Sequence, residues 1–385
     1  MLLIKNAKIY TMVGNEVIEN GSILIEDGKI KEVGKDIVAP LDAEVIDAEG
    51  RLVTPGFIDA HCHLGMWEDG IGFEGSDGNE AVDPVTPHLR AIDGINPMDV
   101  TFKEAREGGI TCVATGPGSA NVVGGQFVAI KTYGDRIDDM IVKEPLAMKV
   151  AFGENPKRVY DSQKKSPTTR MATAAILRET LAKAKRYVEK LEKAKDDPSK
   201  APEYDMKMEA MAKVIRKEIP LKAHAHRADD IFTALRIAKE FDVDITLEHC
   251  TEGHLIADHL AKEGKPAIVG PTLSDRSKYE LKNLTFDTPR VLHNAGVKIA
   301  IMTDSPVIPL QYLPICAGLA VRAGLDEMEA FKAITINPAE ILGIQDRVGS
   351  IEVGKDADIV IFDGNPIKDL GCKTFAVFID GKRVK

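Results

Sequence analysis

Eight apolar, β-rich runs constrain the fold of this 385-residue chain more than any other feature. They lie between residues 52 and 304, are separated in most cases by helical patterns, and include ITCVATG, LAMKVAFG, DITLEHCT and KIAIMTD. Continuous apolar runs that alternate with helices are typical of a parallel sheet buried on both faces. The pattern therefore predicts a (β/α)8 barrel, although a glycine-rich connection at 117–125 takes the place of one helix.

The two ends of the chain show a different pattern, of short strands broken by Asp-Gly and other turn signals. We expect residues 1–54 and 347–385 to form the two halves of one small β-sandwich. Residues 55–346 then form the barrel, with a helical insertion at about 166–219. The plainest interpretation of this insertion is a solvated helical hairpin on the barrel rim; a lid and a subunit contact are the alternatives.

Helical spacing of apolar residues and a long polar stretch complete the expected organisation of the barrel. Helices are expected at 228–242, 254–264, 287–295 and 326–342. Residues 66–95 are rich in Gly, Asp, Glu and Pro without periodicity, which predicts a long loop over the barrel mouth.

Composition narrows the class of partner. The chain has 60 acidic and 50 basic residues, a net charge of -10 and no basic stripe interleaved with aromatic residues, so we expect a small-molecule substrate and neither nucleic acid nor membrane. Five scattered cysteines without a CxxC pair fit a reducing, cytoplasmic location. Lys5 and Lys8 interrupt the apolar start, so no signal peptide is expected. The sequence does not determine the oligomeric state, and a homo-oligomer is one of the possible states.

Four of the predicted strands end in residues that can bind a metal. His61 and His63 are two positions apart and therefore project from one face of the first strand. The later strand ends carry His224 and His226, His249, and Asp304. Because the carboxyl ends of barrel strands surround one mouth, we expect these side chains to converge. Imidazoles combined with a carboxylate are the ligands of catalytic zinc sites.

The chain resembles the amidohydrolase superfamily of metal-dependent hydrolases, in particular its imidazolonepropionase-like and prolidase-like branches. The motifs that carry the resemblance are PGFIDAHCH at 55–63, AHAH at 223–226, EHC at 248–250, TDSP at 303–306 and the tail from 335 to 363. The resemblance implies a (β/α)8 barrel beside a terminal β-sandwich. It also implies one or two divalent metals per chain, zinc before others, and hydrolysis of an amide or cyclic amide by an activated water.

The resemblance implies a role for each matching residue. His61 and His63 would bind one metal, and His224 and His249 would bind a second metal or position the substrate. Asp304, which with His249 is expected at the catalytic centre, would be both ligand and general base. A carboxylate beside an activated water can accept its proton and later deliver it to the leaving group.

The number of metals depends on Lys149, at the end of the fourth apolar run. A free lysine is cationic and repels a metal. In binuclear members of the superfamily, the lysine at the matching position is carboxylated by CO₂ and bridges two metals. We expect Lys149 to be this bridge; the alternative is that Glu154 serves a mononuclear or differently bridged site.

The absence of a glutamate after the fifth barrel strand constrains the type of reaction. Deaminases of the superfamily commonly carry a glutamate three residues after the strand-five histidine, whereas here Arg227 follows His224 and Asp229 follows His226 at that spacing. This departure favours amide hydrolysis over deamination. A mononuclear deaminase or ring hydrolase and a non-catalytic scaffold relative are the alternatives.

Three further residues are candidates for substrate binding. His226 shares a strand face with His224. Arg158 and Tyr160 follow the fourth strand, where a guanidinium can hold a substrate carboxylate by a bidentate contact. The expected substrate is accordingly small and dipeptide-like or carboxylated.

Overall fold

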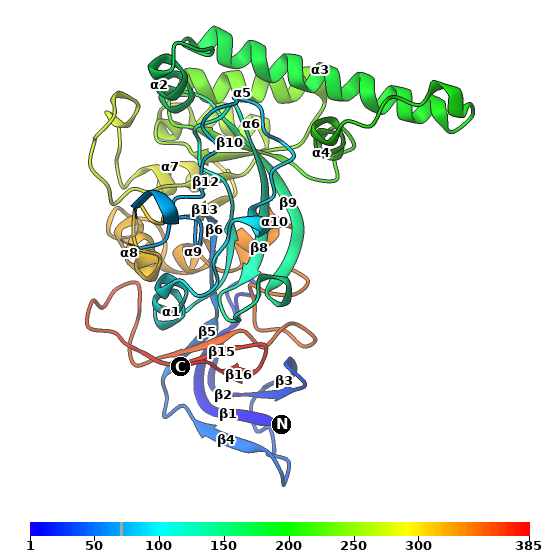
Figure 1. Cartoon of the computed structure of the whole chain (residues 1–385). Helices are drawn as coiled ribbons and strands as arrows, with labels where there is room; N and C mark the ends of the chain where they lie inside the picture. The colour runs from blue at the N-terminus through cyan, green and yellow to red at the C-terminus, as the bar shows by residue number, and fades with distance from the viewer. Residues whose placement is uncertain (70–71) are drawn as a thin grey trace.

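The computed structural model describes residues 1–69 and 72–385, and its strands form two hydrogen-bonded sheets (Figure 1). The barrel sheet contains β6 (Phe57–Cys62), β7 (Ile110–Thr115), β8 (Val123–Lys131), β9 (Ile141–Ala151), β10 (Leu221–Ala225), β11 (Ile245–His249), β12 (Ala267–Val269) and β13 (Ile299–Ile301). The terminal sheet contains β1 (Leu2–Tyr10), β2 (Val17–Glu26), β3 (Lys29–Gly34), β4 (Glu44–Asp47), β5 (Leu52–Pro55), β14 (Ile359–Phe362), β15 (Thr374–Ile379) and β16 (Lys382–Arg383).

The barrel sheet has eight strands that follow one another in chain order from β6 to β13. Side-chain and loop contacts bring its two ends together. Asp59 on β6 accepts hydrogen bonds from the backbone N–H and the hydroxyl of Thr303, which follows β13, at 2.9 and 2.6 Å. The backbone N–H of His63 also donates to the carbonyl of Ser305, at 2.8 Å. The sheet is therefore a nearly closed barrel of the expected strand number.

The expectation of a wholly parallel barrel is wrong at one strand. β8 pairs antiparallel with both β7 and β9, whereas β6 with β7, and β9 through β13, pair in parallel. A parallel connection needs a crossover of about a dozen residues or more. The short glycine-rich link at 116–122 cannot supply one, so the chain reverses at this point.

Ten α-helices lie among the described residues. They are α1 (Val100–Glu107), α2 (Glu154–Ser162), α3 (Arg170–Ala194), α4 (Met206–Ile215), α5 (Ala228–Phe241), α6 (Ala257–Glu263), α7 (Thr288–Asn294), α8 (Leu313–Arg322), α9 (Glu327–Lys332) and α10 (Ile336–Leu342). The helices expected at 228–242, 254–264 and 287–295 are present as α5, α6 and α7. The single helix expected at 326–342 is instead two, because Pro338 has no N–H for the carbonyl of Ile334 and its ring would clash with that carbonyl, so proline fits only in the first turn of α10.

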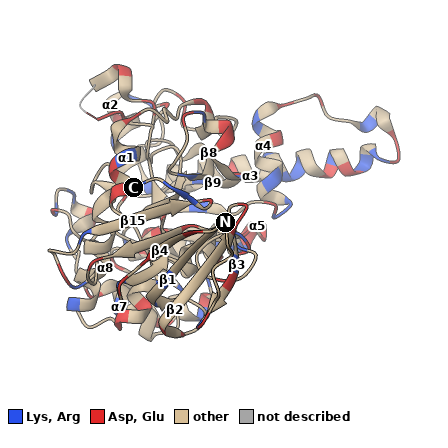
Figure 2. Cartoon of the chain, turned by 90° about the horizontal axis from the view of Figure 1, so that it is seen from below, with Lys and Arg blue, Asp and Glu red and all other residues tan. Residues whose placement is uncertain are grey.

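The insertion between β9 and β10 forms a helical hairpin on the rim of the barrel (Figure 1). α3 buries a stripe of apolar residues that includes Leu177 and Leu181, and its Arg178 forms an ion pair with Glu240 of α5. The far part of α3 projects from the body, and basic and acidic residues alternate along its ribbon (Figure 2). The stretch at 66–95 has no α-helix or long strand among its described residues, and positions 70 and 71 of this expected loop lie outside them.

Both ends of the chain contribute to the terminal sheet, in which β5 pairs with β1 on one side and with β14 on the other. All eight barrel strands lie between β5 and β14 in the sequence. The strand pairing shows one continuous sheet, with β4 as a branch on β1, so the expected β-sandwich is not confirmed.

A buried cluster of charges connects the barrel to the terminal sheet. Lys131, the last residue of β8, is 3% exposed and lies 2.7 Å from Asp358, 3.0 Å from Asp356 and 3.2 Å from Asp380. Several carboxylates around one buried ammonium raise the pKa of Lys131 above its ordinary 10.5, although burial alone would lower it. In the part of the chain that the structure describes, no helix combines the length and the apolarity that crossing a membrane requires.

Candidate metal centre

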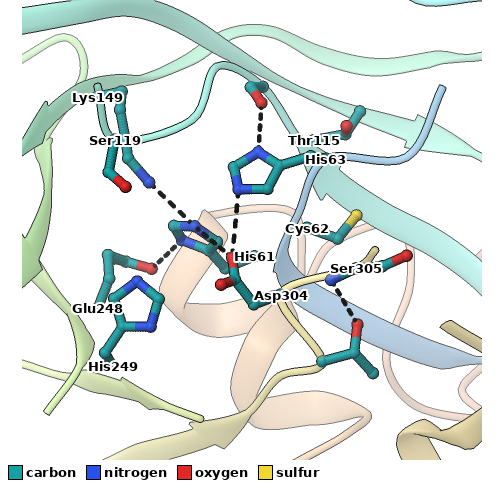
Figure 3. A network of polar contacts seen from close by, with 12 residues as sticks. His61, Cys62, His63, Thr115, Ser119, Lys149, Glu248, His249, Asp304 and Ser305 are labelled. Carbon is teal, nitrogen blue, oxygen red and sulfur yellow. Dashed lines mark hydrogen bonds and ion pairs between the residues drawn. The ribbon is translucent and has the colours of Figure 1, made fainter. Parts of the chain in front are cut away.

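His61 and His63 present the same ring atom to the barrel mouth (Figure 3). The Nδ1 atom of His61 lies 2.7 Å from Oε2 of Glu248, and Nδ1 of His63 lies 2.7 Å from the carbonyl oxygen of Gly116. Both partners can only accept a hydrogen bond, so each Nδ1 carries the hydrogen and each Nε2 is unprotonated. A carboxylate or carbonyl on the second ring nitrogen is the usual way to orient a histidine that binds metal.

Asp304 lies between these two rings and the mouth of the barrel. It follows β13 with a φ of 53°, and its Oδ1 is 3.2 Å from Nε2 of His63 and 3.6 Å from Nε2 of His61. Its side chain keeps 16% of its surface exposed, while both imidazoles are buried. Asp304 is therefore close enough to share a metal with the histidines and open enough to meet a substrate.

Lys149 reaches the same point from β9. Its Nζ is 3.0 Å from Nε2 of His61, and its side chain is fully buried. Burial lowers the pKa of Lys149 to about 8, although the nearby carboxylates of Asp304 and Glu248 oppose the shift. The neutral amine, which is the form that reacts with CO₂, is thereby accessible near neutral pH.

Three more histidines gather at the ends of β10 and β11. His249 is held by a 2.8 Å contact of Nδ1 with the carbonyl of Gly270, and His226 by a 2.7 Å contact of Nδ1 with the hydroxyl of Thr251. Burial lowers the pKa of these two residues and of His224 well below the ordinary 6.5. All three rings are therefore neutral at physiological pH, the state in which imidazole binds metal.

The arrangement fits a divalent metal. Two overlapping sets, His61 with His249 and Asp304, and His224 with His226 and His249, have their potential ligand atoms within 4.8 Å of one another. The Nε2 atoms of His224 and His249 are buried and have no hydrogen-bond partner among the described residues. Buried polar atoms normally have hydrogen-bond partners. Two buried nitrogens without one therefore indicate a site that binds an ion. Nitrogen and carboxylate ligands suit zinc.

A cavity of about 340 Å³ adjoins the cluster. Its lining includes His224, His226, Asp304, Ser119, Asn155 and Lys278. The volume lies in the range of small-molecule sites, and several polar groups converge on it.

Two residues predicted to bind substrate do not line this cavity, and the structure corrects that expectation. Both residues lie on helix α2, which the sequence pattern did not predict. Arg158 is exposed on the helix, and Tyr160 is buried with its hydroxyl donating to Oδ1 of Asn121. Residues i and i+2 face different sides of a helix, so the two side chains cannot hold one substrate together.

Sequence reasoning missed the charged residues that support the cluster. Glu248 belongs to the EHC motif at 248–250, but the motif alone predicted no role for it. The residue shares a strand face with Thr246 and contacts His61. The buried ammonium of Lys222 is 2.9 Å from the same Glu248 oxygen, without hydrogen-bond alignment. A lysine and a glutamate inside apolar strands were the signal that could have revealed this pair.

Glu280 was missed for a different reason, because it lies in the irregular segment after β12. Its backbone N–H donates to Glu154 Oε2 at 2.8 Å, and the backbone N–H of Glu154 donates to Glu280 Oε2 at 3.0 Å. Glu154 is thus engaged with Glu280, and no contact with Lys149 is present. No periodicity in the sequence marks such a long-range pair.

Known proteins resemble this chain along most of its length. The model of the Amidohydrolase family matches residues 52–384. The chain is 31% identical to the amidohydrolase tasK of Hapsidospora irregularis over 94% of its own length, but it spans only 39% of that protein. It is 26% identical to the imidazolonepropionase of Sphingopyxis alaskensis, with 94% of this chain and 91% of the relative covered.

Solved structures show the same likeness. The structure of an amidohydrolase from Thermotoga maritima superposes with a TM-score of 0.97 at 47% identity, over 100% of both chains. A prolidase bound to N-methylphosphonate-L-proline shares the fold, with a TM-score of 0.62 at 18% identity, over 100% of this chain and 99% of that chain. The chain therefore belongs to the Amidohydrolase family, whose members are hydrolases of amide and other C–N bonds.

Proposed function

We propose that this protein hydrolyses an amide or cyclic amide bond in a small, dipeptide-like or carboxylated substrate, with one or two divalent metals, most of all zinc, as cofactor. The observation that carries the proposal is the position of Asp304. Its carboxylate is next to the Nε2 atoms of His61 and His63 and also lines the cavity. A substrate in that cavity meets the carboxylate and the metal ligands at once.

The residues of the cluster have different roles in the proposed reaction. When bound, a divalent metal supplies an acidified water and polarises the substrate carbonyl. His61, His63 and Asp304 would hold the first metal, and His224 and His249 would hold the second. Asp304 accepts the proton of the attacking water and delivers it to the leaving nitrogen.

Lys149 would be carboxylated in this mechanism, and its carbamate would supply an anionic ligand to both metals. It is formed when the neutral amine attacks CO₂ and loses a proton. The position of Nζ, 3.0 Å from the Nε2 atom of His61, supports this role. The carbamate is an anion, which removes the repulsion that an ammonium would impose on a metal.

Deamination has less support from the structure. Arg227, at the position where deaminases commonly carry a glutamate, forms an ion pair with Asp229 at 2.8 Å, and neither residue lines the cavity. We further propose that the partner is a small molecule, with neither nucleic acid nor a membrane surface involved, and that the protein acts in the cytoplasm.

The test is Asp304→Asn, assayed with dipeptides, N-acyl amino acids and cyclic amides. The variant is expected to keep most of its metal and to lose activity by about 10²–10⁴-fold, the usual contribution of a general base. Asp258→Asn is the matched control for turnover, because Asp258 is exposed on α6 and does not line the cavity. Asp275→Asn is the control for metal content, because Asp275 is exposed on the cavity wall but is not one of the proposed ligands.

Substantial activity in Asp304→Asn would refute the assignment of the base. Release of ammonia from amino-heterocycles, without hydrolysis of any amide, would favour the deaminase alternative. A metal-loaded wild-type protein that turns over no C–N substrate would favour a non-catalytic relative.

A further inference from the structure

Glu280 is a buried carboxylate to which the proposed reaction gives no role. It is 0% exposed, and its Oε1 atom has no hydrogen-bond partner among the described residues. An unpaired charge in the interior is costly unless it is neutralised or binds a cation. Some positive group is therefore expected beside Oε1.

The neighbours of Oε1 identify what that group is. Oε1 is 3.7 Å from Nε2 of His226 and 3.9 Å from Nε2 of His224, distances too long for hydrogen bonds. Lys278 Nζ, also 3.9 Å away, instead donates to Asn155 at 2.8 Å. A carboxylate oxygen and two ring nitrogens thus face a common space.

We propose that Glu280 and His226 complete, with His224 and His249, a divalent-metal site of three imidazoles and one carboxylate, with zinc as the preferred ion. This inference rests on the proposed function, in which His224 and His249 already hold the second metal, and it adds two ligands. The two unpartnered ring nitrogens and the unpartnered oxygen then all acquire one partner.

The spacing is close to what a metal requires. With the Lys149 carbamate of the proposed function, these four residues would give the ion five ligands. Neighbouring ligands about 2.0–2.2 Å from a zinc lie about 3.0–3.4 Å apart. The observed separations of 3.7 and 3.9 Å need a closure of about half an ångström, which side-chain rotation can supply. The rings of His226 and His249 are stacked with centroids 4.3 Å apart, and the ligand atoms of these two residues and His224 lie within 4.8 Å of one another.

The backbone before α2 is built to hold this carboxylate. The exchanged hydrogen bonds between Glu280 and Glu154 fix Oε2 and leave Oε1 directed at the histidines. Gly153 has a φ of 82°, and a Cβ there would lie 2.6 Å from Glu280 Oε2. Only glycine therefore allows the carboxylate to approach the chain at this position.

The experiment measures metal directly. Wild type, Glu280→Gln, His226→Asn and the control Asp275→Asn are loaded with zinc, dialysed and analysed for metal content by mass spectrometry. Glu280→Gln and His226→Asn are expected to bind the second ion at least about 10-fold more weakly, while Asp275→Asn matches wild type. The visible spectrum of the cobalt-loaded protein should change in the same two variants, because each loses a ligand.

Gly153→Ala is the second line of evidence, because it keeps all four ligands but displaces the carboxylate. It should weaken the same ion, and circular dichroism confirms that each variant is folded. Unchanged metal content and spectra in Glu280→Gln and His226→Asn would overturn the inference and leave the proposed function intact. A wild-type protein that binds no metal would overturn both.

Discussion

Glu248 offers the sharpest test of how the fold prepares the metal centre. It is fully buried, and its Oε2 atom is both 2.7 Å from His61 Nδ1 and 2.9 Å from the ammonium of Lys222. Replacement of Glu248 by glutamine keeps the shape and removes the charge. Two effects should follow, one on metal binding and one on stability.

The magnitudes follow from the two contacts. At 2.9 Å and an effective dielectric constant of about 20, Coulomb's law gives an attraction of about 6 kcal/mol between Glu248 and Lys222. Removing one partner of a buried pair typically costs about 3–5 kcal/mol of stability. The loss of the carboxylate that orients His61 should separately weaken metal binding about 10–100-fold, as for other partners of metal-binding histidines.

A double variant separates the two effects. In Glu248→Gln with Lys222→Met the buried ammonium is gone, so most of the lost stability should return while metal binding stays weak. Urea unfolding of the metal-free proteins measures the first quantity, and competition with a chromophoric chelator measures the second. Glu252→Gln is the matched control, because Glu252 is also buried but contacts Ala228 and Asn283 and no imidazole.

Two outcomes would contradict this reasoning. Wild-type zinc affinity in Glu248→Gln would mean that the carboxylate does not orient His61 for metal. Recovery of zinc affinity in the double variant would mean that Glu248 acts through stability alone.

Three further predictions rest on other contacts. Lys149→Ala, grown with bicarbonate and zinc, should hold about one metal where wild type holds about two; equal metal content in both would exclude the bridge. Lys131→Met should lower the free energy of unfolding by about 3–5 kcal/mol at neutral pH. Because the pKa of Lys131 is raised in the folded protein, its contribution to the free energy of unfolding is present below pH 10.5 and is lost as the pH rises through the folded-state pKa. The urea midpoints of wild type and variant should therefore converge only in strong alkali. Removal of metal by a chelator should lower the unfolding midpoint, since zinc at about 100 times its dissociation constant adds about 2.7 kcal/mol; identical melts with and without chelator would argue against a bound metal.

The sequence predicted the parts of the fold that depend on local patterns. Apolar runs marked the eight barrel strands, and helical spacing marked α5 and the helices of the insertion. It did not predict that β8 is antiparallel to its neighbours, because an apolar run indicates a buried strand but not the direction of that strand in the sheet. It also did not predict helix α2, on which Arg158 and Tyr160 face different sides and so cannot hold one substrate together.

The sequence by itself determined which residues can meet at the mouth of the barrel. His61, His63, His249 and Asp304 end strands or follow them, and the carboxyl ends of parallel strands share one side of a barrel. Their convergence needs only the alternation of strands and helices, which is a local property of the chain.

Only the tertiary structure decided what surrounds those residues. Glu248 meets His61 across 187 positions, and Glu280 meets Glu154 across 126. These contacts depend on strand order and on the path of an irregular segment, and neither leaves a periodic pattern in the sequence. A buried charge is tolerated only where a distant partner is brought to it, so the fold alone selects which carboxylates can support the metal centre.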